Sequence, residues 1–201
     1  MNLILESNAL RDYLKEIPPY ILFSTPVVQE TIQKIKAEAP SSEQRAKLAF
    51  TIARDQVKHS FDTGNPEVSI NAEEALAHEN GICFAKSHVL ATLLRGMGIP
   101  AGFCYQRVLR KGTVGSGYAL HGLNAVYLEP TGWFRVDPRG NKQGIDSQFT
   151  INKEQLAYPI RPQLGEVDYP NVFIAPIPAV IASMQASATS QELFFKRPET
   201  L

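Results

Sequence analysis

Cysteine catalysis with a histidine base has few candidate residues in this chain of 201 residues, because the sequence contains two cysteines and four histidines. Cys83 follows Asn80-Gly81, a pair typical of tight turns. After Cys83, apolar residues recur at helical spacing, and Gly96, Gly98 and Pro100 then end the pattern. Cys83 is therefore predicted to lie in the first turn of a buried helix, where free N–H groups and the helix dipole favour the thiolate. The alternative is that Cys83 is a small buried hydrophobic residue.

A cysteine nucleophile needs a base beside it and a group that orients the base. His59 and His78 are predicted to end helices, where histidines often bond terminal carbonyls. His88 lies five residues after Cys83, roughly 140° further round the same helix, so the two do not share a face.

His121 is the remaining candidate base. It begins a predicted strand and directly precedes Gly122, a residue that allows backbone or ligand to approach closely. Asp137 ends the next predicted strand, and an antiparallel hairpin would bring it roughly opposite His121, in a register that the sequence does not fix. His121 could instead be a core histidine, and Asp137 a turn residue before Pro138. Together with Cys83 they form a potential Cys-His-Asp triad in chain order.

The bulk composition is that of a soluble globular protein, with 44% hydrophobic and 20% charged residues. We expect one domain over residues 1–201. The net charge is zero, so neither nucleic acid nor an anionic membrane surface is indicated as a partner. Two cysteines do not make a disulfide scaffold, and no signal peptide or membrane helix is evident, which predicts a cytoplasmic protein. Composition gives no oligomeric state.

The periodicity changes along the chain, which predicts an α+β fold with a helical half before an antiparallel sheet. Ser41 with Gln44 and Asn71 with Glu74 have the spacing of capping boxes. The predicted helices span residues 27–39, 41–59, 71–78, 83–96 and 178–184. The predicted half-buried strands span residues 99–105, 121–127 and 133–137. Residues 61–66, 111–117 and 139–157 read as loops, and the proline-rich segment 158–179 as an extended surface wrap.

Four segments carry a resemblance to a known family: Gly81-Ile82-Cys83, Leu94–Ala101, His121–Ala125 and Trp133–Pro138. In this order they resemble the transglutaminase-like superfamily, over about residues 70–140, in a small bacterial-type form. The resemblance implies a papain-like fold with Cys83 as nucleophile, His121 as base and acid, and Asp137 as the orienting group. It implies an enzyme that forms a thioester from a peptide, protein or small amide substrate, then hydrolyses it or transfers the acyl group to an amine. Some members of the family depend on calcium, but we do not expect this chain to do so, since it has no obvious acidic calcium loop. No other cofactor is expected.

Two other functions stay open: a catalytically silent binding protein of the same fold, and a metal site of Cys83, His88 and His121, whose spacing does not suit structural zinc. The backbone N–H of Cys83 is one expected oxyanion donor. Asn80, Gln56 and a strand aromatic are candidates for the second donor. Trp133, Tyr118 and Tyr105 could wall a substrate groove or simply pack in the core. The loop 111–117 could act as a lid or serve only as a hairpin connection.

Overall fold

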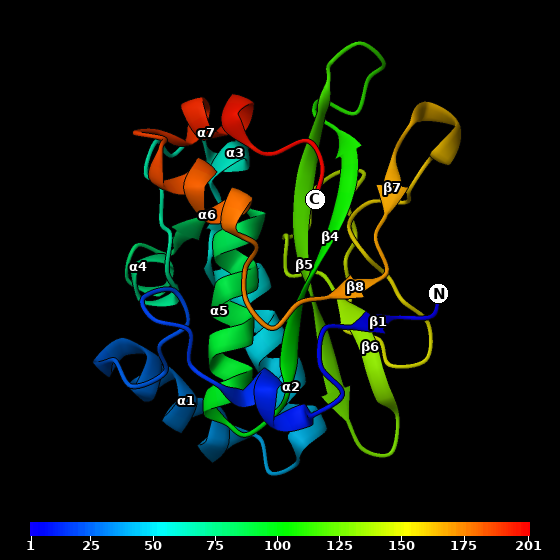
Figure 1. The fold of residues 1–201 in the computed structure, drawn as a ribbon. Coiled ribbons are helices and arrows are strands. Elements are labelled where there is room, and N and C mark those ends of the chain that lie inside the picture. Colours follow the sequence, from blue (N-terminus) through cyan, green and yellow to red (C-terminus); the bar gives the residue numbers. More distant parts are fainter.

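The computed structural model describes residues 1–201. A layer of helices packs against a twisted antiparallel sheet with strand order β6-β5-β4-β7 (Figure 1). The α-helices are α1 (Pro26–Glu38), α2 (Ser42–Thr51), α3 (Ser60–Thr63), α4 (Ala72–Ala77), α5 (Cys83–Gly96), α6 (Pro178–Gln185) and α7 (Ser190–Lys196). Two short 3₁₀ helices, η1 (Leu10–Leu14) and η3 (Pro162–Leu164), and one short π-helix, η2 (Ile52–Gln56), are also present. The strands are β1 (Ile4–Leu5), β2 (Lys58–His59), β3 (Asn80–Gly81), β4 (Ala101–Leu109), β5 (Tyr118–Leu128), β6 (Gly132–Val136), β7 (Val167–Asp168) and β8 (Asn171–Val172). The α+β prediction is confirmed.

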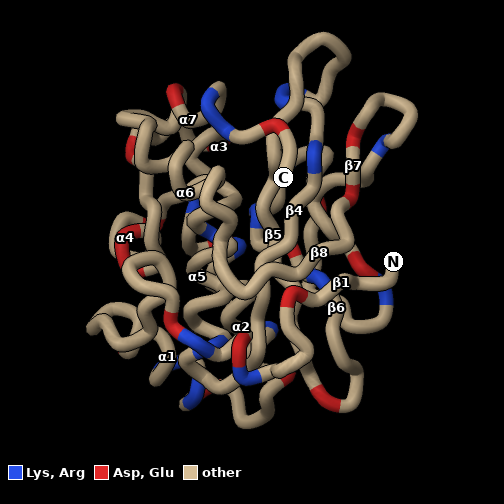
Figure 2. The backbone as a smooth tube through the Cα atoms, in the orientation of Figure 1, with Lys and Arg blue, Asp and Glu red and all other residues tan.

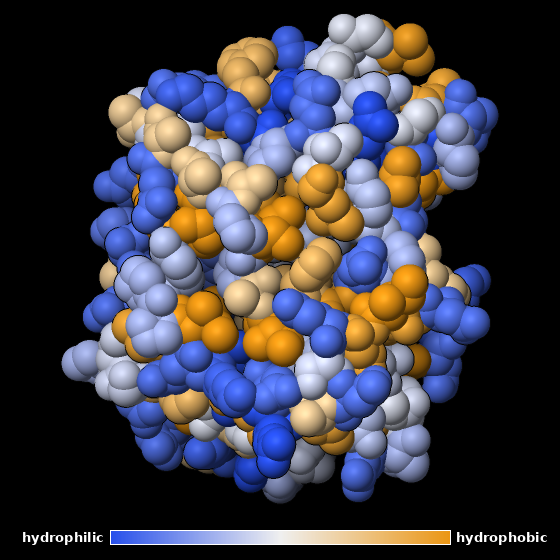
Figure 3. Space-filling view, viewed as in Figure 1, coloured by the Kyte–Doolittle hydropathy of each residue, from blue (hydrophilic) through white to orange (hydrophobic).

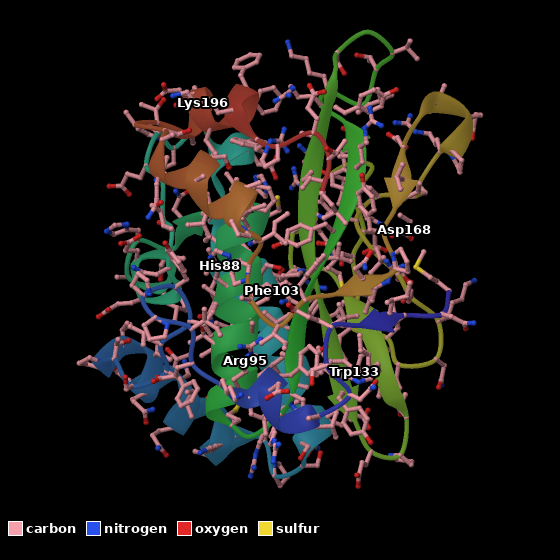
Figure 4. The ribbon with its side chains drawn as sticks, in the orientation of Figure 1. His88, Arg95, Phe103, Trp133, Asp168 and Lys196 are labelled. Carbon is pink, nitrogen blue, oxygen red and sulfur yellow. The ribbon has the colours of Figure 1, made fainter.

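Helix α5 is the central element of the fold. All its residues from Cys83 to Arg95 are buried, because α1, α2 and α4 pack on it from one side and β4 and β5 from the other (Figure 1). At its end the Arg95 guanidinium donates to the carbonyls of Ala101, Lys15 and Ile174. Arg95, which is labelled in Figure 4, thereby fixes the end of the helix to the first residue of β4 and to two irregular segments.

The central strands are longer than their alternating pattern predicted, and both of their faces are covered. Along β5 all residues are buried except Tyr118 and Tyr127. Helix α5 covers one face, and a second apolar cluster that includes Tyr13, Val172 and Trp133 covers the other. The prediction of half-buried strands was therefore wrong, because segments distant in sequence supply the second layer.

Two local predictions before Cys83 also need correction. The helix predicted to reach His59 ends earlier: η2 follows α2, and then Lys58 and His59 pair in parallel with Asn80 and Gly81. Because they are strand residues, neither Asn80 nor Gly81 forms the expected turn, and the positive φ of 49° belongs to Glu79. The segment 61–66, expected as a loop, begins with the short helix α3, which ends at Gly64 with a φ of 72°.

The C-terminal region contains structure that local patterns did not indicate. Strand β8 pairs in parallel with β1, β7 joins the sheet edge beside β4, and α7 follows the expected α6. On the face in Figure 3, hydrophobic residues lie in separate groups among hydrophilic ones. No helix has both the length and the hydropathy needed to cross a membrane.

Candidate active site

Cys83 is the first residue of α5, and the structure places it against β5. The preceding Ile82 offers no side-chain cap, so the first N–H groups of the helix have no partner within it. A Cβ on Gly81 would lie 2.7 Å from the Cβ of Ala85, and a Cβ on Gly122 would lie 2.8 Å from Cδ1 of Phe84. Both glycines therefore let the first turn of α5 approach closely, as expected for Gly122.

The register of the sheet determines how His121 meets Asp137. Strand β6 pairs with Asn124–Leu128 of β5 and leaves the preceding part of β5 without a strand on that side. Asp137 is one residue past this ladder, diagonal to His121, and its Oδ2 lies 2.8 Å from Nε2 of the imidazole. Asp137 is fully buried and His121 is 2% exposed. The second ring nitrogen, Nδ1, is therefore the one left for the thiol of Cys83.

The carboxylate of Asp137 does more than contact His121. It also accepts hydrogen bonds from the backbone N–H groups of Arg139 and Ala157, each at 3.0 Å. The two interpretations of Asp137, a turn residue and an orienting group, are thus not exclusive. The turn after β6 holds the carboxylate in the position from which it meets the imidazole.

The charges at the site stabilise a thiolate beside an imidazolium. Burial alone lowers the pKa of His121, but the negative charges of Asp137 and of a Cys83 thiolate raise this pKa to about 9. Burial raises the pKa of Cys83, yet the positive charge of the neighbouring His121, followed by the Arg197 charge, lowers it overall. Burial raises the pKa of Asp137, but His121 and the two backbone N–H donors hold it below its usual value.

His59, which the sequence interpretation set aside, lies at this site. As part of β2 it is opposite Gly81 in the ladder, and it is 7% exposed. Its Nδ1 accepts a hydrogen bond from the backbone N–H of Phe61 at 3.3 Å, and its Nε2 has no partner. Burial, followed by the nearby charges of Arg139, Lys86 and Arg197, lowers the pKa of His59 well below 6.5, so the ring is neutral with its proton on Nε2.

Cys83, His121 and His59 share one cavity of about 500 Å³. This volume falls in the usual range for small-molecule sites. The cavity is formed mainly by α3, the end of β4, the residues after Asp137 and the chain around α7. Its further lining includes Phe61, Asp62, Arg139, Tyr158, Phe194 and Arg197. Tyr158 packs edge-on against His121, with ring centroids 4.8 Å apart.

Several other residues considered in the sequence lie elsewhere. His88 (Figure 4) bonds the carbonyl of Ile70 and packs against Phe103, so the structure does not bring it to Cys83 and His121. No group of three or more histidine, cysteine, aspartate or glutamate side chains is arranged to hold a metal ion.

The remaining candidates have packing roles or point away. His78 lies beside Glu67 at the surface, Gln56 is exposed, and Asn80 is buried with its amide directed to the Glu67 carbonyl. Trp133 packs on Tyr13 and Tyr127, the Tyr105 hydroxyl accepts from the backbone of Ile177, and the Tyr118 hydroxyl donates to Leu164. These aromatic residues do not line the cavity, whereas Lys111 and Gly112 of the 111–117 loop do.

The comparisons with known proteins identify the family. The model of the transglutaminase-like superfamily matches residues 29–138, more than half of the chain. The chain belongs to the transglutaminase-like superfamily. Cys83, His121 and Asp137 all lie in the part of this transglutaminase-like chain that the family model matches, and so does His59. Arg197 and Tyr158 lie beyond it.

Similar solved structures have low identity to this transglutaminase-like chain. A candidate cysteine protease from Cytophaga hutchinsonii is 13% identical, with a TM-score of 0.49 over 66% of this chain and 43% of that chain. The periplasmic domain of TgpA from Pseudomonas aeruginosa is 16% identical, with a TM-score of 0.46 over 66% of this chain and 48% of that chain. The chain thus spans less than half the length of these structures. Among curated proteins, none matches this chain.

Proposed function

We propose that this protein is a cysteine-dependent enzyme that cleaves an amide or peptide bond, or transfers its acyl group, through a thioester on Cys83. The observation that carries the proposal is the buried hydrogen bond between His121 Nε2 and Asp137 beside a thiol at a helix start. A binding protein without catalysis has no need of a thiol, an imidazole and a carboxylate buried together, because a buried ion pair adds little stability by itself.

In the first half of the reaction, the Cys83 sulfur attacks the carbonyl carbon of the amide. A carbon–sulfur bond forms, and the electron pair of the C=O π bond moves to the oxygen. The resulting oxyanion lies beside the start of α5, where the backbone N–H of Cys83 can donate to it. As the carbon–nitrogen bond breaks, the His121 imidazolium gives its Nδ1 proton to the leaving amine.

In the second half, water or an amine attacks the thioester. The now neutral His121 takes the proton of this nucleophile, and the sulfur leaves as thiolate. Asp137 holds the ring with its Nε2 proton facing the carboxylate, so Nδ1 stays directed at the sulfur in both halves. Nothing in this sequence of steps requires a cofactor.

We assign the second oxyanion donor to the Nε2–H of His59. The ring is neutral, its Nδ1 is engaged by Phe61, and its Nε2–H lines the cavity with no other partner. His59 also pairs across the short parallel ladder with Gly81, two residues before Cys83. A preorganised donor at this place stabilises charge that develops only in the transition state.

Replacing His59 with leucine should lower kcat/KM about 10²-fold, the usual effect of losing one oxyanion donor. His59→Gln retains a side-chain N–H and should recover part of this loss. The alkylation rate of Cys83 by iodoacetamide should be unchanged in both variants, because that displacement forms no oxyanion. If alkylation fell together with turnover, His59 would be positioning the Cys83–His121 pair, and the donor assignment would be wrong.

The experiment that tests the proposed function is profiling of the purified protein against peptide and glutamine-amide libraries, with and without added amines. We expect turnover and a Cys83-linked acyl intermediate detectable by mass spectrometry of the intact protein. Products that incorporate the added amine indicate acyl transfer, and free acids indicate hydrolysis. Binding of library members without turnover or acylation would instead support the silent binding protein.

A further inference from the structure

The cavity that contains Cys83 carries an excess of positive charge, although the whole chain has a net charge of zero. Two acidic residues line it, Asp62 and Glu166. Its basic lining residues are Arg110, Lys111, Arg139, Lys142, Arg161 and Arg197. In Figure 2, Lys and Arg segments lie at the end of α7 and at the neighbouring end of the β4–β5 hairpin. An imbalance of this kind favours anionic ligands.

Ion pairs account for only part of this charge. Arg139 and Lys142 both contact Asp62, and Arg161 contacts Glu166. These pairs use both acidic residues of the lining.

Arg110 is also held by the protein, since it donates to the backbone carbonyls of Phe194 and Tyr118 and lies 3.4 Å from the exposed Glu199. Lys111 is on the exposed hairpin loop. Arg197 is therefore the buried charge that remains to be explained.

Arg197 is 8% exposed and makes no ion pair. Its guanidinium lies over the rings of Phe61 and Phe194, 5.1 and 4.9 Å from their centroids, and its Nε donates weakly to the Phe194 carbonyl at 3.4 Å. The two terminal nitrogens have no hydrogen-bond partner. A buried cation is normally paired, and a guanidinium fork matches the two oxygens of a carboxylate.

Arg197 and Cys83 line the same cavity, and the charge of the guanidinium favours the Cys83 thiolate. An anion bound by Arg197 would therefore share this cavity with the scissile bond, on the wall formed by α7 and α3.

We propose that Arg197 is the anchor of a carboxylate subsite, so that the substrate is an amide with a carboxylate next to the bond that Cys83 attacks. This inference rests on the proposed function and specifies its substrate class. The carboxylate comes either from an aspartate or glutamate side chain or from the α-carboxylate of a C-terminal residue. The aromatic rings of Phe61 and Phe194 hold the guanidinium in place before the substrate arrives, which reduces the entropic cost of binding.

The subsite is tested first without turnover, by protection of Cys83 from iodoacetamide. Pairs of probes differ in one group: an N-acetyl dipeptide with a free C-terminal carboxylate or a C-terminal amide, and the same dipeptide amide with glutamate or glutamine. The carboxylate member of at least one pair should protect about tenfold better or more, as expected for charge-assisted hydrogen bonds. The pair that shows the preference identifies which carboxylate is recognised.

Arg197→Gln should remove this preference, with protection in each protein measured against its own rate of alkylation without a probe, because the Arg197 charge also favours the Cys83 thiolate. Arg197→Lys keeps the charge without the fork and should show an intermediate preference, which also covers the case in which the glutamine variant does not fold. Lys196→Gln is the matched control, because it removes an exposed positive charge one residue away and should change nothing.

In turnover assays with the same pairs, Arg197→Gln should raise KM for the carboxylate substrate much more than for the amide substrate. Any loss of kcat that follows from a weaker Cys83 thiolate should be the same for both substrates. Equal protection by both members of each pair in the unmodified protein would overturn the subsite, even if amides are turned over. Carboxylate protection without any acylation of Cys83 would support the subsite while the proposed function fails.

Discussion

Replacing Cys83 with alanine should abolish turnover while the protein remains folded. The loss should be on the order of 10⁶-fold, the scale observed when a catalytic nucleophile is removed. The side chain is 2% exposed and packs in the main core, and deletion of one heavy atom there costs about 1 kcal/mol of unfolding free energy. Turnover of the best amide from the library and thermal unfolding of both proteins are the two measurements.

Cys104→Ala is the matched control for this prediction. Cys104 is also fully buried, but it belongs to the second apolar cluster on the far face of the sheet. This variant should lose a similar amount of stability and keep its activity. Retained activity in Cys83→Ala would remove the nucleophile assignment, and a Cys83→Ala protein that does not fold would favour a purely structural role.

Asp137→Asn should lower kcat/KM by about 10²- to 10⁴-fold, less than the loss of the nucleophile. Three N–H groups meet the carboxylate, from His121 Nε2 and from the backbone of Arg139 and Ala157. An amide has only one oxygen, so in either orientation its NH₂ group faces at least one of these donors. In one orientation the NH₂ group faces His121 Nε2, so the substitution permits the wrong imidazole tautomer, and in both orientations the negative charge beside the imidazolium is lost. It should also lower the unfolding free energy by about 1–3 kcal/mol.

The pH dependence separates this account from a purely structural role of Asp137. The carboxylate raises the pKa of His121, so its loss lowers that pKa. A less charged imidazole then raises the pKa of Cys83, which the positive His121 normally lowers. The alkylation profile of Cys83 should accordingly shift to higher pH in Asp137→Asn. An unchanged profile with unchanged turnover would leave Asp137 as a structural residue and reduce the triad to a dyad.

Short-range patterns were sufficient to predict the elements that carry the three proposed catalytic residues. The apolar residues at helical spacing after Cys83 predicted α5, and the glycines and proline that follow predicted its end, because both are local signals. The register between His121 and Asp137 was not available from the sequence, since it depends on where β6 stops pairing with β5. The prediction that Asn80 and Gly81 turn failed because their pairing with Lys58 and His59 overrides local turn preference.

His59 and Arg197 were missed for a related reason. His59 reaches the cavity through a ladder of two residues per strand, too short to leave a periodic signal. Arg197 follows α7, which packs against α3 and α6 far from Cys83 in the sequence. One local signal was present, because Thr189 caps the backbone N–H of Glu192 in the spacing typical of a helix start. This spacing would have predicted α7, although it would not have predicted that α7 forms part of the cavity wall.

The proposed catalysis requires Cys83 to be an activated thiolate in the folded protein. The measurement is the iodoacetamide alkylation rate of each cysteine across pH, followed by peptide mapping. We expect Cys83 to react at about pH 6, where an ordinary thiol is protonated. Cys104 should stay unreactive, because burial raises its pKa to about 12. Equal labelling of the two cysteines at that pH, or labelling mainly at Cys104, would contradict the assignment of Cys83 as the nucleophile.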